Sequence, residues 1–127
     1  MTRINEADRD VLEQAIYLPM IIIILERDLK IIEKSPFKIK QPYITLMENT
    51  IRKVRSDLKE VKDKMRKGNM RVTQIGHDES FTMYEFHYKG YDEQHNYFNP
   101  RIRNKCEELL ELYLNKEDIK NIYRTND

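Results

Sequence analysis

Glycine, proline and cysteine are scarce in this chain, and tryptophan is absent. The 127 residues contain three glycines, four prolines and one cysteine. So few glycines and prolines argue against a disordered chain and against an all-β fold rich in tight turns. The lone cysteine, Cys106, excludes a disulfide within the chain, which is typical of a reducing intracellular compartment. Its helical spacing with Ile102, Leu109 and Leu110 predicts a buried apolar side chain rather than a reactive thiol.

Motifs for catalysis and for cofactor binding are also missing from the sequence. There is no Walker loop, no dinucleotide-binding fingerprint and no Gly-x-Ser-x-Gly elbow. Of the three histidines, no pair has the close spacing of a common zinc motif, although Asp92 and Glu93 lie nearby in the chain. Strand alternation places His87 on the face opposite Tyr84 and Phe86. We therefore predict surface or hydrogen-bonded histidines, no metal, no cofactor and no enzymatic activity.

The longest apolar run, residues 16–25 (IYLPMIIIIL), is short. A membrane-spanning helix needs about 20 apolar residues, and Pro19 interrupts this run. A signal peptide would need a basic flank and a small-residue cleavage site, whereas acidic side chains precede the run. We predict no membrane segment and place the run in the deepest part of the core.

Two long helices are predicted, over residues 5–34 and 42–67. Asn5 is a typical N-cap with Asp8 as its partner, and the first helix ends before Ser35-Pro36. We expect Pro19 to kink this helix. Pro42 suits the first turn of the second helix, and Gly68 suits its C-terminal end. The short link between them predicts an antiparallel pair.

A regular heptad of apolar side chains runs along the second predicted helix. Such a seam must pack against another helix, either the first helix or one from a second copy of the chain, and the heptad alone does not decide between them. The seam consists of Ile44, Met47, Ile51, Val54, Leu58, Val61 and Met65.

After Gly68 the apolar period changes from that of a helix to that of a strand. Residues 70–88 read as a β-hairpin, and residues 91–97 are a candidate third strand. Asn99 is expected to cap a third helix over 100–114, with Pro100 as its first residue, and residues 118–123 to add a turn of helix. The prediction is one domain over 1–127 of the α+β class. It is mostly helical, with an antiparallel helical hairpin, a β-hairpin and a C-terminal helix.

The net charge of +1 conceals an uneven distribution. Residues 1–33 carry four basic and seven acidic side chains, and residues 52–71 carry nine basic and three acidic ones. Five cations form a stripe beside the apolar seam: Arg52, Arg55, Lys59, Lys62 and Arg66. Such a row can follow the phosphates of a nucleic acid. We favour the alternative, in which the stripe pairs with the acidic first helix or is solvated.

The third predicted helix carries its charges against the helix dipole. Arg101, Arg103 and Lys105 come first, although cations near a helix N-terminus are usually unfavourable. One explanation is an anion-binding site, in which Arg101 and Arg103 bind a phosphate or carboxylate and His95 and Tyr97 lie beside them. We favour the other, in which the arginines pair with acids of the first helix or of another subunit.

Four segments resemble small uncharacterised proteins from prophages of Bacillus-type bacteria. They are YLPM (17–20), KSPFKIKQPY (34–43), FTMYEFHYKGY (81–91) and NYFNPRIRNK (96–105). The resemblance implies a bacterial cytoplasm and a phage-linked role, but it carries no activity and no functional residues. It implies a protein that binds a host or phage macromolecule.

Together these observations predict a non-enzymatic binding or regulatory protein that is homo-oligomeric through its long helices. The apolar surface of the first helix is too wide for one helix and a small hairpin to cover. The alternatives are a nucleic-acid-binding accessory protein that uses the basic stripe, and a small-anion or nucleotide binder at the start of the third helix.

Overall fold

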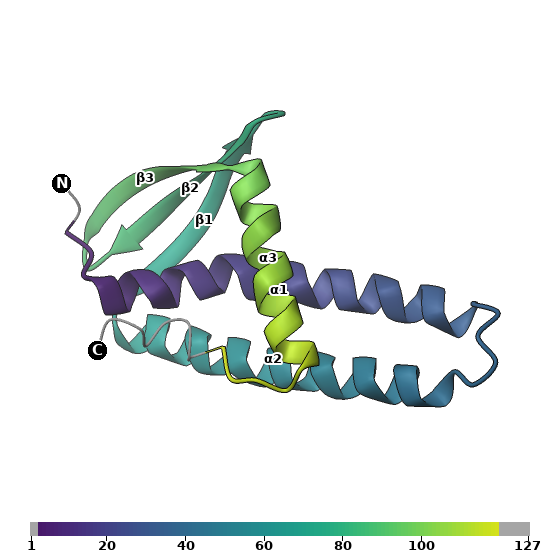
Figure 1. Ribbon diagram of the computed structural model, residues 1–127. Coiled ribbons are helices and arrows are strands. Elements are labelled where there is room, and N and C mark those ends of the chain that lie inside the picture. The colour runs from purple at the N-terminus through teal and green to yellow at the C-terminus, as the bar shows by residue number, and fades with distance from the viewer. Residues whose placement is uncertain (1–2, 120–127) are drawn as a thin grey trace.

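Two long antiparallel helices form the frame of the molecule, as the computed structural model in Figure 1 shows. The structure describes residues 3–119. Helix α1 spans Glu6–Glu33 and helix α2 spans Gln41–Lys67, and the two lie side by side. A three-stranded sheet covers one end of this helical pair, and helix α3 crosses the pair near its middle. The fold is therefore α+β and mostly helical, as predicted.

Local signals set the ends of both long helices close to the predicted residues. The Asn5 side chain caps α1 by accepting a hydrogen bond from the Asp8 backbone N–H at 2.8 Å. Pro42 lies in the first turn of α2, and Gly68 is its C-cap. Helix α1 continues through Pro19 as one 28-residue helix.

The heptad seam of α2 packs against α1 within the same chain. Met47, Ile51, Val54 and Val61 are buried in the core, and Leu58 and Met65 pack against it, whereas Ile44 is half-buried. An ion pair across the two helices, Arg55 to Glu26 at 3.2 Å, lies beside the seam. The helix that the seam packs against is therefore α1 of the same chain.

The sheet has three antiparallel strands in chain order, β1 (Met70–His77), β2 (Phe81–Tyr88) and β3 (Tyr91–Phe98). The candidate third strand is therefore real, and the predicted hairpin is part of a larger sheet. Lys89 and Gly90 form the turn between β2 and β3, both with positive φ (51° and 89°). Such a pair defines the tight hairpin turn that suits twisted strands. It fixes the pairing of Tyr88 with Tyr91 and of His87 with Asp92.

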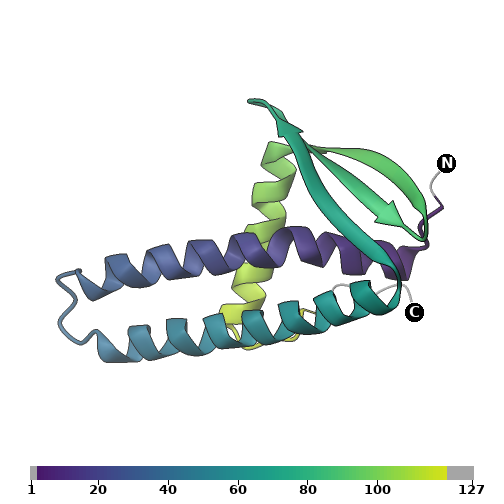
Figure 2. The same cartoon turned by 180° about the vertical axis from the view of Figure 1, so that it is seen from behind.

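Helix α3 (Asn99–Leu114) follows β3 directly and crosses both long helices, as the opposite views in Figures 1 and 2 show. The predicted cap is wrong by one residue, because Phe98 is the N-cap and Asn99 is already helical. The Asn99 side chain instead accepts a hydrogen bond from the Thr82 hydroxyl at 2.7 Å, which ties α3 to β2. Asp118 and Ile119 are not helical, and residues 120–123 of the predicted extra turn lie outside the described residues.

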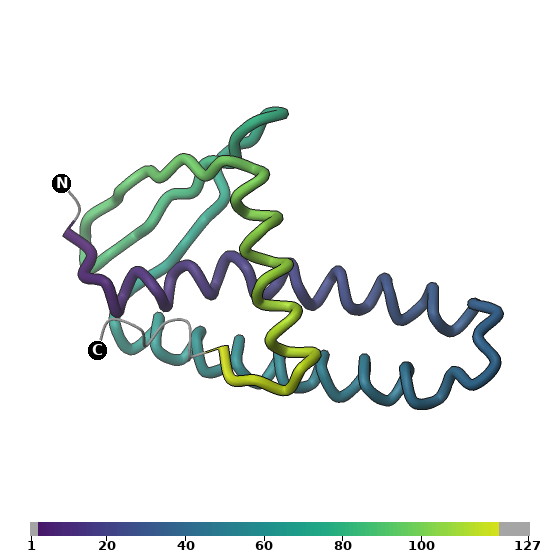
Figure 3. The backbone as a smooth tube through the Cα atoms, viewed as in Figure 1, coloured from purple at the N-terminus to yellow at the C-terminus, as the bar shows by residue number. Residues whose placement is uncertain are grey.

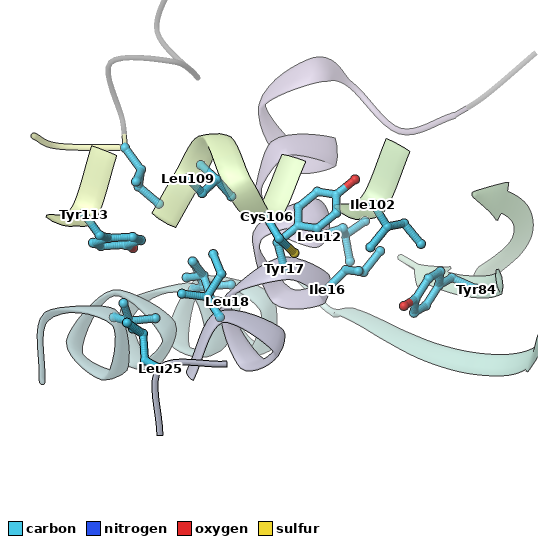
Figure 4. Packing of buried hydrophobic residues seen from close by; sticks show 14 of the residues in the cluster. Leu12, Ile16, Tyr17, Leu18, Leu25, Tyr84, Ile102, Cys106, Leu109 and Tyr113 are labelled. Atoms are coloured by element: carbon cyan, nitrogen blue, oxygen red, sulfur yellow. The ribbon is translucent and has the colours of Figure 1, made fainter. Parts of the chain in front are cut away.

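The core lies where α3 crosses α1 above α2, and the tube in Figure 3 shows this crossing. In Figure 4, Leu18 of α1 lies toward Leu109 and Tyr113 of α3, and Leu12 of α1 lies toward Cys106 of α3. Leu12, Leu18 and Leu109 are fully buried. The prediction that residues 16–25 lie in the deepest part of the core holds for one side of α1. On the other side, Ile23 and Ile24 are exposed. Within residues 3–119, no helix is long and apolar enough to cross a membrane.

Asp57 of α2 is a buried polar group in this core. It accepts a hydrogen bond from the Tyr113 hydroxyl of α3 at 2.7 Å and pairs with Lys53 at 2.9 Å. The interaction with Asp57 also raises the pKa of Lys53. Asp57 thus anchors the end of α3 to α2. The Tyr84 hydroxyl, in contrast, is buried with no hydrogen-bond partner within the described residues.

Replacing Asp57 tests this anchor. Asp57→Ala leaves the Tyr113 hydroxyl buried without its acceptor, so the free energy of unfolding should fall by about 1–3 kcal/mol. Asp57→Asn keeps an acceptor oxygen and should cost less. Urea denaturation followed by circular dichroism measures both. Equal losses for the two variants would contradict the role of the hydrogen bond.

Candidate functional site

The far end of the helical hairpin carries an exposed apolar surface. Of the ten large apolar side chains that are exposed in residues 3–119, six lie in residues 23–43. In both Figures 1 and 2 this end extends beyond α3 and the sheet, with no other element of residues 3–119 over it. We call this set the apolar end: Ile23, Ile24, Ile31, Phe37, Ile39 and Tyr43. A concentration of this kind is typical of an interaction surface.

The apolar end continues into a groove between α1 and α3. The groove has a volume of about 470 Å³, and its apolar lining includes Met20, Ile24, Ile102, Cys106 and Leu110. Thr82, Asn99, Arg103 and Glu107 supply its polar residues. Met20, Ile24 and Ile31 follow one another at four and seven residues, which keeps them on one side of α1. One apolar strip therefore runs from the groove to the apolar end.

Charged side chains of both signs flank the apolar end. Arg27, Lys30 and Glu33 are exposed, and none of them forms a salt bridge within residues 3–119. Their charges thus remain available to a partner of mixed charge.

The predicted basic stripe is present on the exposed side of α2. Arg55, Lys59, Lys62 and Arg66 line a hollow of about 450 Å³, together with Leu58 and Asp63. Three of the five cations have partners: Arg52 bonds Asn49, Arg55 pairs with Glu26, and Arg66 pairs with Asp63 at 3.1 Å. Lys59 and Lys62 form no salt bridge among the described residues. The part of the stripe most open to an anion is therefore its centre.

The structure does not bring together the four residues of the predicted anion-binding site, Arg101, Arg103, His95 and Tyr97. Arg103 lines the groove, and Arg101 is exposed near the start of α3. His95 and Tyr97 face the core, where His95 lies 3.0 Å from Glu93 and the Tyr97 hydroxyl donates to Glu13 at 2.9 Å. A carboxylate beside each of these two side chains disfavours an anion there.

The sheet is held to α1 by tyrosines that bond acidic side chains. The Tyr88 hydroxyl donates to Asp8 at 2.6 Å, and Tyr97 bonds Glu13 in the same way. Burial and the nearby Glu13 carboxylate raise the pKa of Tyr97, so this hydroxyl stays protonated. Two acidic side chains of α1, Asp8 and Glu13, therefore hold the sheet.

Sequence reasoning missed a cluster on the outer face of the sheet. Glu85 and His87 of β2 and Asp92 of β3 place one possible ligand atom each within 4.8 Å of one another. Two features of the sequence could have indicated this cluster. Glu85 and His87 are two residues apart on one strand, and the Lys89-Gly90 turn pairs His87 with Asp92. Neither part resembles a zinc motif by spacing alone.

These features define a small, mostly helical α+β protein with an exposed apolar hairpin end. The chain belongs to the YhjD protein family, whose model matches residues 3–118. It is 43% identical over 114 residues to the uncharacterized protein YhjD of Bacillus subtilis strain 168, which covers 90% of this chain and 95% of that relative. No solved structure matches the chain. The resemblance to small uncharacterised Bacillus proteins is thus confirmed, and a prophage origin stays a prediction.

Cys106 offers a test of how closed the groove is. The side chain is buried, and burial raises the pKa of its thiol, so the reactive thiolate is scarce at neutral pH. A thiol reagent such as Ellman's reagent should react slowly with the native protein and quickly with the protein in guanidinium chloride. Rapid reaction of the native protein would show that the groove opens in solution.

Proposed function

We propose that this protein is a non-enzymatic binding protein that self-associates through the apolar end of its helical hairpin. The observation that carries the proposal is the exposure of Ile23, Ile31 and Ile39, which are 67%, 58% and 66% accessible. Side chains of this size gain about 1.5–3 kcal/mol each when they are fully buried. Leaving several of them together in water favours a partner that covers them.

A second copy of the chain fits this surface better than an unrelated partner. Two hairpins packed through their apolar sides form a four-helix arrangement with two-fold symmetry. Charges of both signs lie beside the apolar end, namely those of Arg27, Lys30 and Glu33. In an antiparallel pair of copies, unlike charges of this kind can face each other. The groove along Met20 and Ile24 would extend the same interface toward α3.

The cellular setting is part of the same proposal. A single free cysteine that is buried agrees with a reducing bacterial cytoplasm. A phage-linked role, in which the assembled protein binds a host or phage macromolecule, remains a hypothesis.

Charge placed in the apolar end should abolish self-association. We expect wild-type protein to elute as a dimer or larger, at two or more times the chain mass of 15.5 kDa, when molar mass is measured by light scattering. The double variant Ile23→Lys/Ile31→Lys should be a monomer with the same helix content, because each copy would bring two like charges to the interface, and the pair would bury four.

The matched control is Ile75→Lys, which charges an exposed isoleucine of β1 far from the hairpin end. It should leave the molar mass unchanged. A compact wild-type monomer at micromolar concentration would refute the proposal.

Nucleic-acid binding is a second candidate, supported by the hollow that four cations line on α2. Lys59→Ala/Lys62→Ala removes the two cations at its centre. If the stripe binds a DNA duplex, the slope of log affinity against log salt should become shallower by about 1.8, since each phosphate contact contributes about 0.9.

Lys34→Ala/Lys38→Ala, at the hairpin end, is the control of equal charge, and it should leave the slope unchanged. Equal effects of the two double variants would indicate a nonspecific charge effect. Binding that is insensitive to salt would remove this candidate.

A further inference from the structure

The outer face of the sheet brings three possible metal ligands together. Glu85 and His87 are two residues apart on β2, so they share the face opposite the buried Tyr84 and Phe86. The turn at Lys89-Gly90 sets Asp92 directly across from His87. The His87 and Glu85 side chains are 23% and 26% accessible, and that of Asp92 is 62% accessible. The cluster is thus half-sheltered and open to an ion from solvent.

The two sides of the His87 ring differ in geometry. Its Nδ1 lies 2.7 Å from Asp92 Oδ1, which is the length of a charge-assisted hydrogen bond. Its Nε2 lies 3.4 Å from Glu85 Oε1, longer than such a bond. Metal–ligand bonds of about 2.0–2.2 Å at a tetrahedral zinc ion separate two ligand atoms by about 3.4 Å. The Nε2–Glu85 pair therefore has the spacing of two ligands of one ion.

We propose that His87 Nε2 and Glu85 bind a divalent transition-metal ion of the zinc type, with Asp92 as the positioning residue. The Asp92 carboxylate would accept the Nδ1–H bond and so fix the ring and its tautomer, as carboxylates do beside many metal-binding histidines. An imidazole ligand favours zinc over magnesium or calcium. Water would complete the coordination. The Thr73 hydroxyl also lies near, 3.5 Å from Nε2.

The charges around the cluster fit a cation of modest affinity. Glu85 and Asp92 contribute two negative charges. Arg71 of β1 pairs across the sheet with His87. Arg66 and Arg71 line a hollow of about 580 Å³ with His87 and Asp92, so these positive charges oppose a cation there. Removing the Arg71 charge should therefore strengthen binding.

Titration of the full chain with zinc chloride in a calorimeter tests the proposal. Wild-type protein should bind one equivalent, His87→Ala should bind none, and the isosteric Glu85→Gln should bind about tenfold more weakly. Asp92→Asn should weaken binding by about 10- to 100-fold while one equivalent still binds, because it alters only the positioning of the ring. Arg71→Gln should bind more tightly than wild type.

The control is His77→Ala, which removes an exposed histidine of β1 outside the cluster and should bind zinc as the wild type does. Circular dichroism of each variant separates loss of the site from loss of the fold. Absence of zinc binding by wild-type protein would overturn the proposal and leave the cluster as an ion-pair group. Undiminished binding by folded His87→Ala or Glu85→Gln would overturn it as well.

Discussion

The structure depends on burying the middle of helix α1, residues 15–25, which is apolar on most of its circumference. No single neighbour can cover such a helix, so several elements must surround it. The seam of α2 covers one side, α3 crosses another, and the sheet packs over the N-terminal end. The sheet and α3 lie over the part of α1 that ends near Leu25, whereas α2 lies beside α1 as far as the hairpin end. Beyond that point Leu29 and Ile32 still pack against the core, and Ile31 is left exposed to water.

Polar contacts decide where the covering elements sit. Tyr88 and Tyr97 bond Asp8 and Glu13, which holds the sheet at the N-terminal turns of α1. Tyr113 bonds Asp57 and holds the end of α3 against α2. Because buried hydroxyls and carboxylates are costly without partners, these bonds select one position among the many that apolar packing alone would accept. The exposed hairpin end is thus a consequence of this placement.

The sequence predicted what depends on neighbouring residues, and it missed what depends on pairing across the fold. Asn5, Pro42 and Gly68 act locally, so the long helices were placed within about a residue of their ends. Strand β3 carries polar side chains toward the core, such as Glu93 and His95, and this weakened its alternation. The role of Asn99 depends on Thr82, 17 residues away. The sequence predicted the wide apolar surface of α1. It did not predict which part of that surface stays exposed, because this depends on where α3 packs.

The order of the elements has a consequence for how the chain folds. The α1–α2 pair and both strand pairs join elements that are adjacent in the chain, so their formation closes short loops and should be fast. The bonds of Tyr88 to Asp8 and of Tyr113 to Asp57 close loops of 80 and 56 residues. Docking of the sheet and of α3 onto the hairpin should therefore be the late step. Until it occurs, the whole apolar side of α1 is open, and newly made chains are most prone to aggregate at that stage.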